Sequence, residues 1–174
     1  MRLNLGCSDR HLPGYVNVDI CEPADRRCDL SITPWRWIQD VDPSNVRLGP
    51  RERALYDAPA FETSSVDEIV AHDIIEHLPN KIQTMNEIWR VLKPGAVSDI
   101  IVPTTDGRGA WQDPTHVSYW NRNSMYYYTH GDAHRERFGK AYGIEARFNV
   151  VYENQYSSGD NIVHLHIKLE AVKP

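Results

Sequence analysis

The chain has 174 residues, of which 41% are hydrophobic and 25% are charged, and its formal net charge is -5 at pH 7. This length predicts one domain with a sizeable core, and the negative charge excludes a general attraction to nucleic acid or to anionic membranes. No stretch approaches the roughly 20 apolar residues of a membrane span, and Arg2 is followed by an apolar run too short for a signal peptide. We therefore expect a globular protein of the cytoplasm with no membrane association.

The three cysteines are Cys7, Cys21 and Cys28. Their odd number disfavours a disulfide framework, and their spacing does not match a zinc site. We expect reduced thiols and no cysteine-based metal site.

Two short apolar strands are predicted near the N-terminus, at residues 2–5 and 15–20. Nine residues separate Gly6 from Val16, which is short for a parallel crossover of about a dozen or more residues. The helix expected between such strands is therefore reduced to a turn or two, or replaced by a loop. Residues 28–30 predict a short third edge element.

The middle of the chain predicts an irregular excursion and then a strand, a helix and another strand. Residues 33–64 contain four prolines and one candidate helix at 51–58, and we expect this insertion at the ligand-binding edge of the sheet. A buried strand follows at 66–71. Asn80 is a good helix N-cap with Gln83 as its partner, residues 93–95 are expected to end that helix, and the next strand spans 97–102.

The last third of the chain predicts a long irregular segment and a closing hairpin. Residues 104–140 are rich in Gly, Asn, Asp, His and aromatic residues, with weak periodicity. Two strands at 148–156 and 162–172 are joined by a turn at 157–160, which is typical of an antiparallel hairpin.

Gly6 and Asp19 end the first two strands in the arrangement that an adenosine-containing ligand needs. A glycine there lets the backbone approach the ligand, and a carboxylate can accept hydrogen bonds from both ribose hydroxyls. The alternative for Asp19 is a cap on the turn after the second strand. Because Cys7 and Ser8 follow Gly6, the G-x-G-x-x-G loop that cradles a pyrophosphate is absent, which disfavours a nicotinamide oxidoreductase.

Three segments in this order resemble a class I S-adenosylmethionine-dependent methyltransferase, in a small branch of that family: LNLGCS at 3–8, DIIEHLP at 73–79 and NEIWRVLKPGA at 86–96. The resemblance covers residues 2–103, and 146–172 by pattern only. It implies an α/β fold with a Rossmann-like, doubly wound, mostly parallel sheet of seven strands, the last antiparallel. The whole chain, 1–174, would be a single domain with the insertion at 33–64 and a lid at 104–140.

The resemblance also implies S-adenosylmethionine as cofactor, with S-adenosylhomocysteine as product, and a set of residues that hold it. The methionine part would lie near Gly6, Cys7 and Ser8, the ribose at Asp19, and the adenine beside Ile20, Asp29 and Leu30, while His72 and Asp73 would face the methionine end. Two departures from the family pattern are Ser8, where a second glycine is usual, and the shortened first helix.

Residues 111–121 concentrate groups suited to an acceptor site after the fifth strand. Methyl transfer is an in-line displacement that depends on alignment and exclusion of water, and an oxygen or nitrogen acceptor can also need a base. Asp113 and His116 are the candidate catalytic bases, with His116 slightly favoured. The candidate substrate-binding residues are His77, Trp111 and Tyr119. The alternative is an ordered loop whose aromatic side chains cover the sheet.

Two motifs that are missing from the sequence narrow the range of possible methyl acceptors. Methyltransferases of this fold that act on amino groups in nucleic acid carry an Asp/Asn-Pro-Pro-aromatic motif after the fourth strand, where this chain reads HDII at 72–75, and no Pro-Cys dipeptide of cytosine-carbon enzymes occurs. We expect a small molecule, a sugar-like group or an exposed polymer end, and not duplex nucleic acid.

Two further hypotheses stay open. The first is a non-catalytic cofactor-binding module or an inactive partner subunit, motivated by Ser8 and the shortened first helix. The second is a metal-dependent enzyme that uses His77, Asp113 and His116.

His164 and His166 share one face of the last strand, where a solvated or hydrogen-bonded pair is the expected state.

Overall fold

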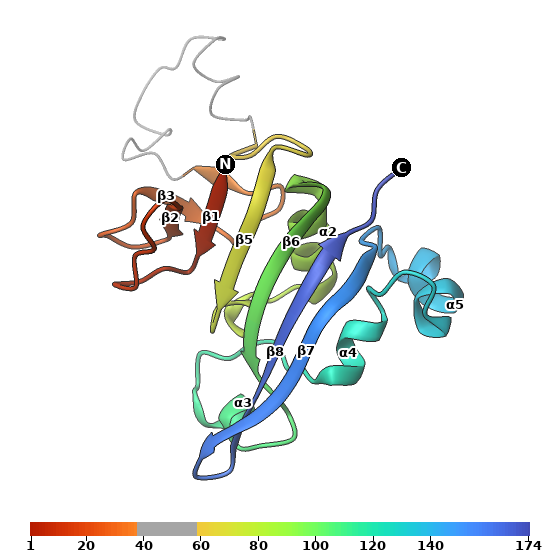
Figure 1. Cartoon of the computed structure of the whole chain (residues 1–174). Helices are drawn as coiled ribbons and strands as arrows, with labels where there is room; N and C mark the ends of the chain where they lie inside the picture. Colours follow the sequence, from red (N-terminus) through yellow and green to blue (C-terminus); the bar gives the residue numbers. More distant parts are fainter. Residues whose placement is uncertain (38–58) are drawn as a thin grey trace.

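Eight strands form one sheet within residues 1–37 and 59–174, the part of the chain that the computed structural model describes (Figure 1). The spatial order is β4-β3-β2-β1-β5-β6-β8-β7. The strands are β1 Arg2–Leu5, β2 Val16–Asp19, β3 Arg26–Asp29, β4 Arg36–Trp37, β5 Val66–His72, β6 Leu92–Pro103, β7 Phe148–Gly159 and β8 Ile162–Ala171.

The sheet confirms the predicted Rossmann-like α/β class. Five neighbouring strands run parallel: β3, β2, β1, β5 and β6. Strand β8 is antiparallel to both of its neighbours, β6 and β7. The described strands number eight rather than the expected seven, because β4 adds an antiparallel edge to β3 through the pairs Cys28↔Trp37 and Asp29↔Arg36.

One long helix follows β5, and shorter helices lie between β6 and β7. The helices are η1 Ile75–His77, a 3-10 helix, and the α-helices α2 Lys81–Val91, α3 Gly109–Gln112, α4 Arg122–Tyr126 and α5 Ala133–Tyr142. Asn80 caps α2 as predicted, because its side chain accepts from the Gln83 backbone N–H at 3.0 Å. Residues 93–95 do not end the helix: β6 already begins at Leu92, which pairs with Val66.

The hairpin of β7 and β8 is longer than predicted, and its turn is tighter. Asp160 and Asn161 both have positive φ, 49° and 58°, as two-residue hairpin turns that fit the twist of a sheet require. Register shifts between Val150 and Tyr152, and between Ser157 and Gly159, interrupt the pairing of β7, which is the edge strand.

The core lies between one face of the sheet and the layer of α2 and α4. In the four central strands, alternate residues point into it and are nearly or fully buried, as shown by Leu3, Leu5, Ile69, Ala71, Ile100, Val102, Leu165, Ile167 and Leu169. Trp120, Met125 and Tyr128 belong to the same core. Residues 120–128 of the expected lid therefore pack against the sheet as part of the core, and 104–119 remain as the loop at the sheet edge.

The opposite face of the sheet is largely polar, although Val70, Val97 and Ile101 also lie on it. The residues that alternate with the core positions include Arg2, Glu68, His72, Asp99, His166 and Lys168, and none of them is buried. Parallel sheets usually have both faces covered by helices. The second helical layer of a doubly wound sheet is not found in the described residues, and polar side chains take its place.

A loop replaces the first helix, and a buried polar network holds it. The Asn4 amide donates to Arg10 O and to Asn17 Oδ1, at 2.8 and 2.9 Å, and the Leu12 N–H donates to Asn17 Oδ1 at 2.8 Å. Asn17 in turn donates from its backbone and its side chain to Asp25 Oδ2, at 2.9 and 2.7 Å. The network closes the β1–β2 connection without a helix.

The insertion was expected at the ligand-binding edge, but its described flanks lie at the other edge. Phe61 packs edge-on against Trp35 and Trp37, and its carbonyl accepts from Arg90 near the end of α2. The chain then enters the amino end of β5. The helix predicted at 51–58 lies outside the described residues.

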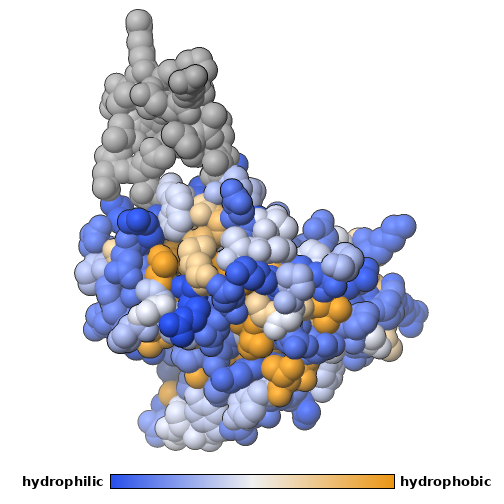
Figure 2. All heavy atoms as spheres, turned by 45° about the horizontal axis from the view of Figure 1, so that its top comes forward, coloured by the Kyte–Doolittle hydropathy of each residue, from blue (hydrophilic) through white to orange (hydrophobic). Residues whose placement is uncertain are grey.

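The described surface gives no sign of a membrane span. None of the helices among the described residues is long and apolar enough to cross a membrane. In the view of Figure 2, hydrophobic residues occur in small areas among hydrophilic ones.

We expect Asn17→Ala to lower the free energy of unfolding by about 2 kcal/mol, because the buried Asn4 amide and the Leu12 N–H lose their acceptor. Urea denaturation would measure the change. Asn149→Ala is the control, since the Asn149 amide donates to Glu170 on the exposed surface. Equal effects of the two substitutions would show that the network does not hold the loop.

Candidate active site

The loop after β1 turns at Gly6, which has φ +63°. A Cβ at this position would lie 2.5 Å from Ile74 Cγ1, so the glycine also permits the close approach of the segment that follows β5. The sequence predicted close approach of a ligand at Gly6; the described residues place Ile74 there.

Asp19 joins the loops after β1 and β2. Its carboxylate accepts from the Ser8 N–H at 2.9 Å and from the Cys21 N–H at 3.1 Å. The capping alternative for Asp19 is therefore present in the structure. Each carboxylate oxygen offers about two acceptor positions, so both can still accept from ribose hydroxyls. Ile20, next in the chain, is exposed.

Asp29 ends β3, Leu30 follows it, and both have local partners. Asp29 Oδ1 accepts from the backbone and the hydroxyl of Ser31, at 2.9 and 2.6 Å. Leu30 is buried, and its carbonyl accepts from Trp35 Nε1 at 3.2 Å. These contacts hold the chain at the place where the adenine was expected.

Cys7 contributes its backbone, since its N–H donates to Val18 O at 3.2 Å. Burial, with a further contribution from Asp19, raises the pKa of the Cys7 thiol to about 11. The thiol is therefore protonated at neutral pH and unsuited to act as a nucleophile.

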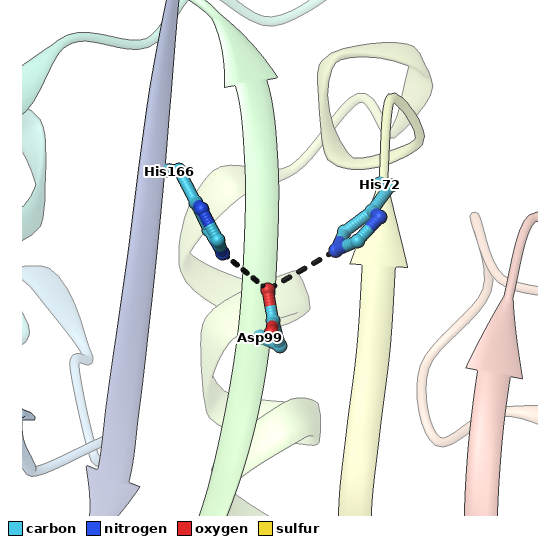
Figure 3. A group of neighbouring side chains, drawn as sticks. All are labelled: His72, Asp99 and His166. Carbon is cyan, nitrogen blue, oxygen red and sulfur yellow. Dashed lines mark hydrogen bonds and ion pairs between the residues drawn. The ribbon is translucent and has the colours of Figure 1, made fainter. Parts of the chain in front are cut away.

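His72 and Asp73, adjacent in sequence, have different partners. Asp73 has φ +54°, and its carboxylate lies 3.7 Å from the Arg10 guanidinium, which links the β1–β2 loop to the end of β5. His72 lies on the polar face of the sheet, where its Nε2 and that of His166 are 3.1 and 2.8 Å from Asp99 Oδ1 (Figure 3). The structure thus brings Asp73, and not the His72 ring, to the predicted cofactor loop.

Asp99 is the centre of that group on the sheet face. Burial raises the pKa of its carboxyl, but hydrogen bonds from Lys168, His72 and His166 outweigh burial and leave the pKa below its usual value. Both histidines of the last strand are hydrogen-bonded, as expected: His166 to Asp99, and His164 to Ser158 Oγ at 3.4 Å, with its ring stacked on Tyr156.

A cavity of about 360 Å³ opens beyond the carboxyl ends of β5 and β6. Ligand sites of open α/β sheets lie at this edge. Its lining includes Arg10, Asp73, Glu76, His77, Asp113 and His116. The structure therefore brings three predicted residues, His77, Asp113 and His116, into one cavity next to the loop of Gly6.

Glu76 is the buried acid of this cavity. It is 2% exposed, and its Oε2 has no hydrogen-bond partner among the described residues. Burial raises the pKa of its carboxyl to about 8, and the nearby Asp73 and Asp113 add to the shift. Its backbone carbonyl accepts from the N–H groups of Val117 and Ser118, which ties the 104–119 loop to η1.

The two histidines are oriented through their Nδ1 atoms. His116 Nδ1 lies 3.1 Å from Ala110 O, and His77 Nδ1 lies 3.1 Å from Thr115 Oγ1. Because Thr115 Oγ1 donates its own proton to Asp113 at 2.6 Å, it accepts from His77. Both rings therefore carry a proton on Nδ1, and in the neutral tautomer that these contacts favour the lone pair is on Nε2.

The His116 Nε2 faces two carboxylates. It lies 3.9 Å from Glu76 Oε1 and 4.0 Å from Asp113 Oδ2, too far for hydrogen bonds. The His77 and His116 rings meet edge to face, with 4.8 Å between their centroids. Hydrogen bonds from Thr115 lower the pKa of Asp113.

Trp111 and Tyr119 stack on each other with 4.4 Å between ring centroids, and both are exposed. They lie outside the lining of the cavity, although the Tyr119 hydroxyl reaches His116 O at 3.4 Å. Of the three predicted substrate-binding residues, His77 alone lines the cavity.

Sequence reasoning missed Arg10 and the central position of Glu76. Glu76 was not among the predicted site residues. An acid inside the apolar run IIEHL at 74–78 was the available signal, because such an acid is buried only with a specific purpose or partner. Nothing in the sequence marked Arg10.

Residues 7–98, more than half of the chain, match the protein family described as "methyltransferase domain". The chain belongs to this family. Membership confirms the predicted methyltransferase class and S-adenosylmethionine as its cofactor. No curated protein matches the sequence significantly.

Solved structures share the fold of this chain at low sequence identity. A 1,6-didemethyltoxoflavin-N1-methyltransferase of Burkholderia thailandensis, solved with S-adenosylhomocysteine, has TM-score 0.57 and 14% identity over 99% of this chain and 71% of that one. A SAM-dependent methyltransferase of Methanosarcina mazei has TM-score 0.51 and 16% identity over 99% and 92%. The [4+2]-cyclase SpnF has TM-score 0.54 and 11% identity over 99% and 74%. At these identities the likeness concerns the fold.

We expect one thiol per chain to react with iodoacetamide at pH 8 in the folded protein, and all three in urea. Cys21 is exposed, whereas burial raises the pKa of Cys7 to about 11 and that of Cys28 to about 12. Mass spectrometry of the intact protein would count the adducts. Rapid modification of Cys7 would contradict the buried, backbone-bonded state described above.

Proposed function

We propose that this protein transfers a methyl group from S-adenosylmethionine to a polar acceptor held in the cavity of Glu76, His77, Asp113 and His116. The acceptor is a small molecule, a sugar-like group or an exposed polymer end. The observation that carries the proposal is the position of this cavity: it opens at the carboxyl edge of the sheet, and the Arg10–Asp73 contact joins it to the loop of Gly6.

The proposed cofactor site follows the loops after β1, β2 and β3. The backbone of Gly6, Cys7 and Ser8 would hold the methionine part, with Asp73 on the far side. Asp19 would accept from the ribose hydroxyls with the acceptor positions that Ser8 and Cys21 leave open. The adenine would pack on the exposed Ile20 beside Asp29 and Leu30.

Transfer needs the acceptor oxygen or nitrogen in line with the sulfonium carbon, and a place for the acceptor's proton. The cavity offers two proton acceptors. His116 presents an Nε2 lone pair on a side chain that is 8% exposed. Asp113 presents a more exposed carboxylate that Thr115 holds in place. The 104–119 loop, bonded to Glu76 O, would exclude water from one side.

A second candidate is a cofactor-binding module without transfer activity. The close packing of Ile74 against Gly6 and the loop in place of the first helix favour it. A protein of this type would bind the cofactor yet methylate no acceptor alone.

We expect Asp19→Ala to abolish measurable binding of S-adenosylmethionine and S-adenosylhomocysteine, because both carry the ribose that Asp19 is proposed to hold. Isothermal titration calorimetry would measure binding, and thermal unfolding would show that the variant is folded. Asp9→Ala is the matched control, since it removes an exposed carboxylate from the same loop. Retained affinity in a folded Asp19→Ala protein would refute the proposed ribose site.

A further inference from the structure

Glu76, His77 and His116 each offer one ligand atom, and these three atoms lie within 4.8 Å of one another. We propose that they bind a divalent transition-metal ion, such as Zn²⁺ or Fe²⁺, in the cavity. Two histidines and one carboxylate form a ligand set that such ions use in catalytic sites, where open coordination positions remain. Asp113 lies next to the site, with its Oδ2 4.0 Å from His116 Nε2.

The first support is the unpartnered oxygen of Glu76. This carboxylate is 2% exposed, it lines the cavity, and its Oε2 has no hydrogen bond from any described residue. Burying a polar atom without a partner costs free energy, so such atoms are rare in native proteins. A cation in the cavity would supply the missing partner.

The second support is the orientation of the two imidazoles. Histidine ligands of metals usually donate their other N–H to a carbonyl or another polar group, which fixes the tautomer. His116 Nδ1 donates to Ala110 O, and His77 Nδ1 donates to Thr115 Oγ1, which itself donates to Asp113. In this tautomer each Nε2 can bind an ion, and His116 Nε2 already lies 3.9 Å from Glu76 Oε1.

A comparison within the molecule separates this site from the other group of two histidines and a carboxylate. On the sheet face, Asp99 Oδ1 already accepts from His72 and His166, and Asp99 Oδ2 pairs with Lys168 at 2.8 Å (Figure 3). The lysine cation neutralises the carboxylate and would repel a metal ion. No lysine or arginine among the described residues pairs with Glu76.

The ion would also define how the acceptor binds, a consequence that rests on the proposed function. Three protein ligands leave coordination positions for an acceptor oxygen, which favours hydroxyl-bearing acceptors that can reach the metal. His116 would then be a ligand rather than a base, and Asp113 would be the remaining proton acceptor.

The test is titration of the full, tag-free chain with ZnCl₂ by calorimetry, after dialysis against chelator. We expect one ion per chain, and at least about tenfold weaker binding in His77→Ala and in Glu76→Gln. His166→Gln is the matched control for the sheet-face group and should leave the affinity unchanged. No binding, or a loss in His166→Gln alone, would overturn the proposal.

Cobalt substitution keeps the test decisive if a variant fails to fold. The wild-type chain loaded with Co²⁺ should show the absorption of nitrogen and oxygen ligands, whereas a thiolate charge-transfer band would assign the ion to cysteine and overturn the site. Binding of S-adenosylhomocysteine is measured separately on the same protein. Metal binding without cofactor binding would therefore contradict the proposed function alone, and the reverse result would contradict the metal site alone.

Discussion

The nine residues between Gly6 and Val16 are the constraint on which the rest of the structure depends. A chain this short cannot form a helix and return to start a parallel neighbour strand, so it crosses as a loop held by Asn4 and Asn17. The missing helix would have covered one face of the sheet. The strands therefore carry polar residues on that face and apolar residues on the other, a pattern more usual for antiparallel sheets. All described helices that cover the sheet lie on the apolar face.

Most strands and helix α2 could be predicted from the sequence because their signals are local, whereas α3, α4 and α5 lie where an irregular segment was expected, since their short stretches show only weak periodicity. The apolar runs of β1, β5 and β6, the Asn80 cap and the turn after β7 each depend on a few adjacent residues. The boundary between α2 and β6 could not be predicted in this way. Leu92 joins the sheet because it pairs with Val66, which is distant in sequence. The same holds for β4, whose two residues pair with β3 only after the chain has turned back.

The sequence predicted several residues of the candidate site, but not the buried Glu76 at its centre. His77, Asp113 and His116 carried a chemical signal, and the structure brings them together. Glu76 became central because the 104–119 loop folds onto its carbonyl, and that contact between distant segments buries the carboxylate. Trp120 shows the opposite case: its residue type suggested an acceptor site, yet it fills the core under the sheet, because its indole N–H finds a partner in Ser118.

The two edge strands of the sheet are short or irregular, which limits self-association through strand pairing. Exposed edge strands present unpaired backbone groups to other chains, and natural sheets blunt them with short strands or bulges. Here one edge, β4, has two residues, and the other, β7, is interrupted at Val150/Tyr152 and again near its tip. A second molecule would thus find no long, regular strand to extend. In the described part of the chain, the sheet thus has a face that no helix covers and yet offers no long edge strand as a template for aggregation.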